Sequence, residues 1–319
     1  MIRMEHKIEI NQLLAGFAPD DAISNYARRL RRLFESWGYR SRILVDRSCL
    51  DPGLRNEASP FEDDRREAGD RILIYHFSIG SSATDYFLSS PEKRVIVYHN
   101  ITPPEFFWAF QPETAALLAE GRKQLEGLAS ATDLALADSE YNRRELQAAG
   151  FKRSSVLPLS LDAAALEIKP SGRILRRLGN RRDHLLFVGR VAPNKKFEDL
   201  FRVFHHYSKN CRPGAKLILV GKYRPHDIYY GFLRSLFEEL ELENVIFTGL
   251  VRQNEMIAYY QRAGVFLSLS EHEGFGLPLL EAMFLGIPVM AFAAAAVEET
   301  MGGAGVLIRE KDNLGLFPL

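Results

Sequence analysis

The sequence has few cysteines and no excess of charge of either sign. Its only cysteines, Cys49 and Cys211, lie far apart and form no CxxC pair, which disfavours a disulfide framework and a structural zinc site. Lys plus Arg number 41 and Asp plus Glu also 41, so no net positive charge draws the chain to nucleic acid. We therefore expect a folded protein of a reducing compartment without a nucleic-acid partner.

Long hydrophobic runs and several common motifs are also missing. The longest apolar stretch, 285–297, falls short of the ~20 residues that span a bilayer, so we expect no transmembrane helix. Charged residues within 1–10 leave no apolar core for a secretory signal, which predicts a cytoplasmic chain. GxGxxG after the first strand, GxxxxGK with Ser or Thr, and HExxH are absent, which disfavours a dehydrogenase, a P-loop kinase and a zinc protease.

Strand-like and helical patterns alternate along the chain. Strand-like runs occupy 8–14, 71–77, 94–99 and 134–138, and then 184–189, 216–221, 244–249, 265–270 and 287–292. The clearest helix runs from Asp21 to Trp37, where apolar residues recur at three- and four-residue spacing. This alternation predicts an α/β fold of doubly wound parallel sheets with helices on both faces.

The pattern breaks near the middle of the chain. After a run at 156–162 comes a stretch rich in Lys, Arg, Gly and Pro that suits a linker. We therefore predict two Rossmann-like domains, 1–165 and 166–319, which face each other across a cleft. The highly charged segment 51–70 contains two prolines and shows no period, and we predict an exposed loop there.

The segment EHEGFGLPLLEA, 271–282, directly follows a predicted strand. Gly274 and Gly276 fall in the loop, and Pro278 suits the first turn of a helix, whose backbone N–H groups would point at an anion. Glu273 and Glu281 can face one site and accept paired hydrogen bonds from vicinal hydroxyls. A nucleoside-diphosphate sugar has such diols at both ends, although each glutamate alone would also suit a solvated position.

A second candidate site is FVGRVAPNKKFEDL, 187–200. Arg190 comes just past the end of a predicted strand, and Asn194 is placed to cap a helix that Lys195 opens. At the carboxyl edge of the same sheet, Arg190 and Lys195 would neutralise a diphosphate without an acidic metal site. We therefore expect no metal ion and no cofactor, although either cation alone would also suit the surface.

The segments GRVAPNK and EHEGFGLPLLEA, with the E-x7-E spacing of their glutamates, resemble the retaining family 4 glycosyltransferases of GT-B architecture (glycosyl transferases group 1). YHNITPPEFF, 98–107, is similar to a branch associated with bacterial surface polysaccharide assembly. The resemblance implies a hexosyltransferase that acts with retention. Its donor would be a nucleotide sugar of the GDP-mannose or UDP-glucose type, and its acceptor a glycan or a lipid-linked molecule.

The resemblance also implies roles for individual residues. Glu281 would hold the ribose, Glu273 the sugar hydroxyls, and Arg190 and Lys195 the diphosphate. His99 would line the sugar pocket, although a lone histidine after a strand is often structural. Further donor-binding residues implied in this way are Gly16, Phe17, Gly189, Gly274, Phe275, Gly276 and Leu277.

Two other functions fit the same residues. One is a non-catalytic subunit that binds a sugar nucleotide, and the other is a GT-B epimerase that acts on the nucleotide sugar without an acceptor. The chain ends at KDNLGLFPL, before the last helices of the family it resembles, so we expect its C-terminal end to be truncated.

The predicted helix between Asp21 and Trp37 carries four arginines opposite its apolar stripe. They are Arg28, Arg29, Arg31 and Arg32. They form either a solvated face or a docking site for anionic lipid at the inner membrane face, where each basic residue can add about 1 kcal/mol.

Overall fold

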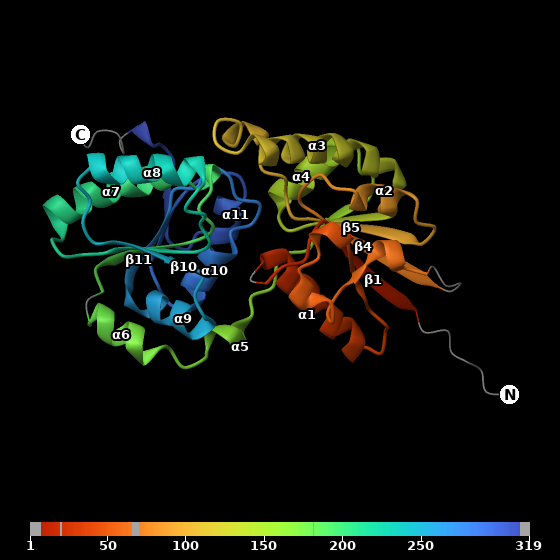
Figure 1. Ribbon diagram of the computed structural model, residues 1–319, viewed down its shortest axis with the longest axis horizontal. Coiled ribbons are helices and arrows are strands. Elements are labelled where there is room, and N and C mark those ends of the chain that lie inside the picture. Colours follow the sequence, from red (N-terminus) through yellow and green to blue (C-terminus); the bar gives the residue numbers. More distant parts are fainter. Residues whose placement is uncertain (1–7, 20, 66–69, 181, 313–319) are drawn as a thin grey trace. The chain divides into compact units, whose positions relative to one another are not determined.

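The computed structural model describes residues 8–19, 21–65, 70–180 and 182–312, which form two compact units (Figure 1). The first unit comprises the chain up to Pro104 together with Glu113–Leu159, and the second comprises Glu105–Pro112 and the chain from Ser160. The predicted boundary after residue 165 falls inside helix α5 (Ala163–Leu166). The described part does not include residues 1–7 and 313–319. The predictions about the two ends of the chain partly rest on these residues.

The first unit is built on a parallel sheet with the strand order β3-β2-β1-β4-β5-β6-β7. The strands are β1 (Glu9–Leu14), β2 (Ile43–Val45), β3 (Ser59–Pro60), β4 (Arg71–Phe77), β5 (Lys93–Tyr98), β6 (Leu134–Ala137) and β7 (Ser154–Val156). The order reverses between β1 and β4, and ligands bind at such a switch point in open α/β sheets.

Four helices accompany this sheet within the described residues: α1 (Ala22–Ser36), α2 (Ala83–Leu88), α3 (Pro112–Leu128) and α4 (Glu140–Ala148). The carboxylate of Asp21 accepts from the backbone N–H of Ser24 at 2.8 Å and caps α1. Helix α1 packs against the sheet through Tyr26 and Ala27, whereas Leu33 and Trp37 are exposed.

The segment 51–70 is only in part the exposed loop that we predict from sequence. It contains β3, and the side chain of Asp64 is fully buried, 2.7 Å from Arg42 and 3.1 Å from Arg71. Two cations hold this carboxylate inside the fold. A segment rich in charged residues gives no sign that one of them is buried, so the prediction from sequence missed it.

The second unit contains a six-stranded parallel sheet within the described residues, with the order β10-β9-β8-β11-β12-β13. Its strands are β8 (His184–Val188), β9 (Leu217–Val220), β10 (Val245–Gly249), β11 (Ala263–Ser268), β12 (Val289–Phe292) and β13 (Val306–Ile308). The switch point of this sheet lies between β8 and β11.

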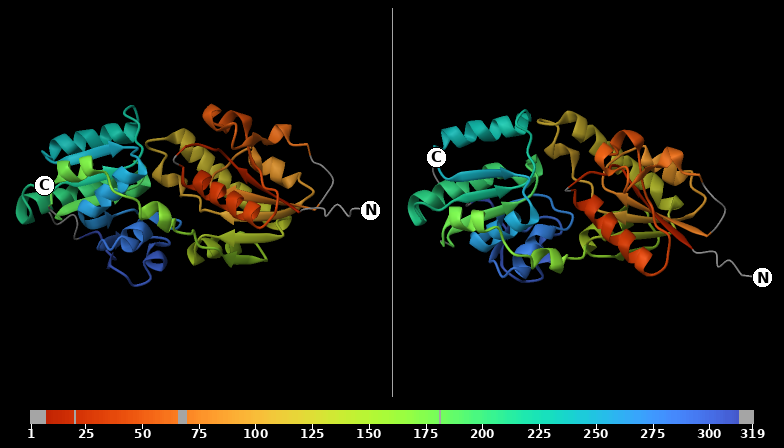
Figure 2. Two further views of the ribbon diagram at one scale, coloured as in Figure 1. Left: turned by 90° about the horizontal axis from the view of Figure 1, so that it is seen from below. Right: turned by 60° about the horizontal axis from the view of Figure 1, so that its bottom comes forward.

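Helices cover both faces of the second sheet (Figures 1 and 2). Besides α5 they are α6 (Gly172–Leu178), α7 (Phe197–His206), α8 (Ile228–Glu239), α9 (Gln253–Arg262), α10 (Leu277–Phe284) and α11 (Val297–Met301). One apolar core lies under α7 and α8, and a second lies under α6, α9, α10 and α11. The predicted fold class, two doubly wound parallel-sheet units, is confirmed.

A short piece of the N-terminal half belongs to the second unit. The ring of Phe110 lies 5.0 Å from that of Tyr229 and 5.9 Å from that of Phe232 on α8, and the amide of Gln111 donates to Asp227 at 3.0 Å. The chain therefore passes between the units at three places and not only after the N-terminal half.

Among the helices of the described part, none is long and apolar enough to cross a membrane.

Candidate functional site

A pocket opens at the switch point of the second sheet. Its wall comes from the ends of β8 and β11, from the turn after β8 and from the start of α10. The lining residues are Phe187, Val188, Gly189, Arg190, Lys195, Phe266, Ser268, Glu273, Gly276, Pro278 and Leu279. The structure therefore brings five of the predicted site residues to one pocket: Gly189, Arg190, Lys195, Glu273 and Gly276.

The loop before α10 has a backbone that glycine favours. Gly276 precedes the helix with φ +88°, and a Cβ added there would lie 2.9 Å from the Leu279 side chain. Pro278 lies in the first turn, as predicted. The positive end of the helix dipole thus points toward the pocket, where it stabilises negative charge.

Lys195 and Glu273 form an ion pair within the pocket wall. Lys195 Nζ lies 2.6 Å from Glu273 Oε2, and both side chains are largely buried. Asn194 joins the same two segments, because its side-chain amide donates to the backbone carbonyl of His272 at 3.1 Å and its backbone carbonyl accepts from the N–H of Glu271 at 2.9 Å. The prediction from sequence that Asn194 caps a helix opened by Lys195 is therefore wrong. Residues 193–195 form a 3-10 turn, and α7 starts at Phe197.

Arg190 is exposed at the end of β8, where it follows Gly189. Gly189 lies against Gly221, and a Cβ added to Gly221, which has φ +147°, would lie 2.1 Å from the Gly189 carbonyl oxygen. This close approach of two loop backbones fixes the position of Arg190 at the mouth of the pocket.

Glu281 lies on α10 beside the pocket, where it accepts a hydrogen bond from the buried hydroxyl of Tyr260 at 2.8 Å. It is half-buried, so the solvated alternative does not describe it. The other predicted residues of this segment, Gly274, Phe275 and Leu277, are half-buried too, in the loop and the first turn next to the pocket.

Sequence reasoning missed the ion-pair network behind this loop. Lys311 Nζ donates to Asp199 at 2.8 Å, to Glu271 at 3.0 Å and to the carbonyl of Leu269 at 2.8 Å. Lys196 Nζ lies 3.3 Å from Glu271 as well. These residues hold the loop after β11, and no local sequence signal points to Lys311.

In the first unit, His99 belongs to a buried chain of hydrogen bonds that crosses the carboxyl edge of the sheet. His99 Nδ1 lies 2.8 Å from Asp138 Oδ2, and its Nε2 lies 2.9 Å from Nδ1 of His76. His76 Nε2 lies 3.0 Å from the oxygen of the Gln12 amide, whose nitrogen donates to the carbonyl of Ala27 at 3.0 Å. Both ring nitrogens of His99 are therefore occupied inside the fold.

The directions of these bonds fix where the protons lie. Because the Gln12 amide donates to Ala27, its oxygen accepts a hydrogen from Nε2 of His76. If the His76 ring is neutral, its Nδ1 then accepts from Nε2 of His99.

The pKa of His76 agrees with this assignment. Burial, together with the neighbouring His99, holds the pKa of His76 well below its usual range, which favours the neutral ring. Burial, and after it the charge of Asp138, raises the pKa of Tyr26 to about 12. The Tyr26 ring lies edge-on to both histidines, at 5.8 and 5.7 Å between centroids.

Gly16 and Phe17 lie just after β1, which ends at Leu14. The ring of Phe17 is buried in the core of the first unit, and the Arg28 guanidinium lies over it, 4.4 Å from its centroid. The side chain of Phe17 thus serves packing. Across the described residues, no cluster of His, Cys, Asp or Glu has the makings of a metal site.

Comparison with solved structures agrees with this architecture. Sucrose-phosphate synthase from Thermosynechococcus elongatus superimposes with a TM-score of 0.75 at 17% identity, over 97% of this chain and 88% of that one. HepE of Anabaena, solved in complex with UDP-glucose, gives 0.71 at 18% identity, over 97% and 87%. The fold is that of the GT-B glycosyltransferases.

Sequence comparison finds a family match within the second unit. Residues 176–313 match the family model of glycosyl transferases group 1, the family that the sequence segments resemble. O-antigen chain mannosyltransferase B of Escherichia coli is 32% identical over 134 residues, 40% of this chain and 33% of that protein. The chain spans a third to a half of the length of the curated relatives it matches first.

Proposed function

We propose that the protein is a retaining glycosyltransferase that moves a hexose from a nucleoside-diphosphate sugar to a glycan or lipid-linked acceptor in surface polysaccharide assembly. The observation that carries the proposal is the pocket at the switch point of the second sheet. Two cations, a carboxylate and a helix N-terminus meet there. This set matches a ligand with a diphosphate beside a polyhydroxylated ring.

Each residue has a role in the proposed reaction. Arg190 and Lys195 bind the diphosphate and stabilise the charge that develops on it as the glycosidic bond to the donor breaks. Glu273 accepts hydrogen bonds from the hexose hydroxyls and Glu281 from those of the ribose. The amides of Gly274–Gly276 bind sugar and phosphate oxygens.

The Lys195–Glu273 ion pair gives this scheme a definite order. An incoming phosphate competes for Lys195, so donor binding releases Glu273 from its partner and leaves its oxygens to the sugar hydroxyls. The acceptor hydroxyl then attacks from the face that the diphosphate leaves, and a phosphate oxygen takes its proton. The scheme retains the anomeric configuration and needs no metal ion.

UDP-glucose and GDP-mannose are the two donors that we propose. HepE, which shares the fold, was solved with UDP-glucose, and a relative of the second unit is named as a mannosyltransferase. Incubation with each donor, with and without a lipid-linked or glycan acceptor, tests the proposal through release of the nucleoside diphosphate. Release that depends on the acceptor supports it, and product formed without an acceptor points to the epimerase.

One observation favours a second function, a non-catalytic subunit that binds a sugar nucleotide. The residues that would hold the donor lie in the second unit, whereas both ring nitrogens of His99 in the first unit are occupied by Asp138 and His76. Donor binding without turnover in the same assay supports this alternative.

We also propose a peripheral contact of α1 with anionic membrane. Arg28 lies 2.7 Å from Glu57, and Arg31 donates to the backbone carbonyl of Glu57. Arg32 is exposed, as is Trp37, whose exposed fraction is 61%, and these two carry the proposal. Sedimentation with phosphatidylglycerol vesicles should fall in an Arg32→Glu, Trp37→Ser variant, with phosphatidylcholine vesicles as the control, and unchanged sedimentation would remove the proposal.

A further inference from the structure

We infer that Tyr260 is a positioning residue for the nucleotide: its buried hydroxyl holds the Glu281 carboxylate in the orientation that receives the ribose. The inference rests on the function proposed above and extends it to a residue outside the pocket wall. It starts from the contacts that Tyr260 on α9 makes with two residues of α10.

The hydroxyl of Tyr260 faces α10. Tyr260 Oη lies 2.8 Å from Glu281 Oε2 and 3.5 Å from the carbonyl oxygen of Pro278. Its ring is fully buried and stacks on Phe266, with 6.2 Å between the centroids and 17° between the planes. The ring is packed on all sides, so the direction of its O–H bond is set by the core and not by solvent.

The hydroxyl keeps its proton at every pH that the protein would meet. Burial, and then the charge of Glu281, raises the pKa of Tyr260 well above 10. Tyr260 is therefore a permanent donor to Glu281. A glutamate side chain that must be ordered on binding lowers affinity about two- to tenfold, and this contact orders it in advance.

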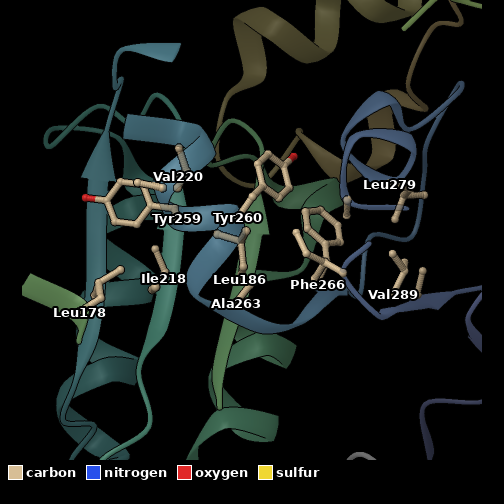
Figure 3. Close-up of a cluster of buried hydrophobic side chains, with 14 of the residues drawn as sticks. Leu178, Leu186, Ile218, Val220, Tyr259, Tyr260, Ala263, Phe266, Leu279 and Val289 are labelled. Atoms are coloured by element: carbon tan, nitrogen blue, oxygen red, sulfur yellow. The ribbon is translucent and has the colours of Figure 1, made fainter. Parts of the chain in front are cut away.

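The next residue along α9 supplies a matched control. Tyr259 is buried in the same cluster, but its hydroxyl points the opposite way, as Figure 3 shows. It accepts from a guanidinium N–H of Arg177 on α6 at 2.9 Å. Tyr259→Phe thus removes a buried hydroxyl from the same helix and the same core without touching α10.

The test compares the affinity of the full chain for UDP and GDP with that for their 2′,3′-dideoxy analogues. In the wild type, loss of the ribose hydroxyls should weaken binding. In Tyr260→Phe, affinity for the natural nucleotide should fall about two- to tenfold, whereas affinity for the dideoxy analogue stays as in the wild type. Turnover should show a raised KM for the donor sugar and an unchanged kcat.

The outcomes separate the inference from the proposal beneath it. Equal ratios of natural to dideoxy affinity in the wild type and Tyr260→Phe would overturn the inference alone, as would a Tyr259→Phe variant that loses the preference equally. A wild type that binds neither UDP nor GDP would overturn the proposed function and the inference with it. Loss of the preference in Tyr260→Phe, with Tyr259→Phe unaffected, supports the positioning role.

Discussion

The buried histidine chain makes the stability of the first unit depend on pH in a way that His76→Gln should abolish. In the folded unit His76 stays neutral, because burial and the nearby His99 hold its pKa well below the usual value. In the unfolded chain its pKa is about 6.5. Below that pH the unfolded state binds one proton more than the folded state, so stability is present above pH 6.5 and is lost as the pH falls.

The size of the effect follows from one proton. Between pH 8 and pH 5 the wild type should lose about 2 kcal/mol of unfolding free energy through His76. His76→Gln lacks this pH-dependent contribution. It also leaves His99 and Gln12 without their hydrogen-bond partner, at a cost of about 1–3 kcal/mol. The variant should therefore be clearly less stable than the wild type at pH 8 and nearly equal to it at pH 5.

Urea unfolding at a series of pH values measures this difference. Trp37 is in the first unit and Trp108 belongs to the second, so a Trp108→Phe background lets fluorescence follow the first unit alone. The groups that face His76 are His99, Gln12 and the edge-on Tyr26, with Asp138 behind His99, and all are the same in both proteins. Wild-type and variant curves that stay parallel from pH 8 to pH 5 would refute the reasoning.

Four further predictions concern the second unit. Glu281→Ala should weaken donor binding measured by calorimetry, because hydrogen bonds to a charged acceptor contribute about 1.5–3 kcal/mol, and unchanged affinity would contradict its ribose role. Lys195→Met should lower turnover about 10²–10³-fold with an unchanged thermal transition, and full activity would argue against its place at the leaving group. Gly276→Ala should lower the unfolding free energy of the second unit by about 1–2 kcal/mol, since φ is +88° there and Leu279 is close, and a neutral result in urea unfolding would count against that strain. Chelator should leave transfer rates unchanged, whereas a chelator-sensitive rate would contradict the metal-free scheme.

Local patterns predicted the frame of the fold closely. The run at 71–77 coincides with β4, and the helix predicted from Asp21 to Trp37 is α1 with those two residues as its caps. Both signals depend on residues near one another in the sequence. The short strands β2, β3 and β13 have only two or three residues each, too few to show a period, and were not predicted.

The site residues that belong to a sequence motif were predicted. Those that only the fold brings to the site were missed. Lys195 and Glu273 are 78 residues apart, and each belongs to a recognisable segment, so their meeting could be anticipated. The hydrogen bond between Tyr260 and Glu281 also joins residues far apart, but no motif marks the tyrosine. Neighbouring strands bring His76 and His99 together, and only the pairing of β4 with β5 reveals that contact.

The membership of Glu105–Pro112 in the second unit has a consequence for synthesis on the ribosome. All residues of the first unit have been synthesised once Leu159 is added. The two aromatic rings of α8 against which Phe110 packs are those of Tyr229 and Phe232, and these are synthesised much later. The aromatic stretch FFWAF must therefore wait outside its final environment while more than a hundred residues are translated. This interval is when the nascent chain is most exposed to misassociation, and when a chaperone that binds aromatic segments would act on it.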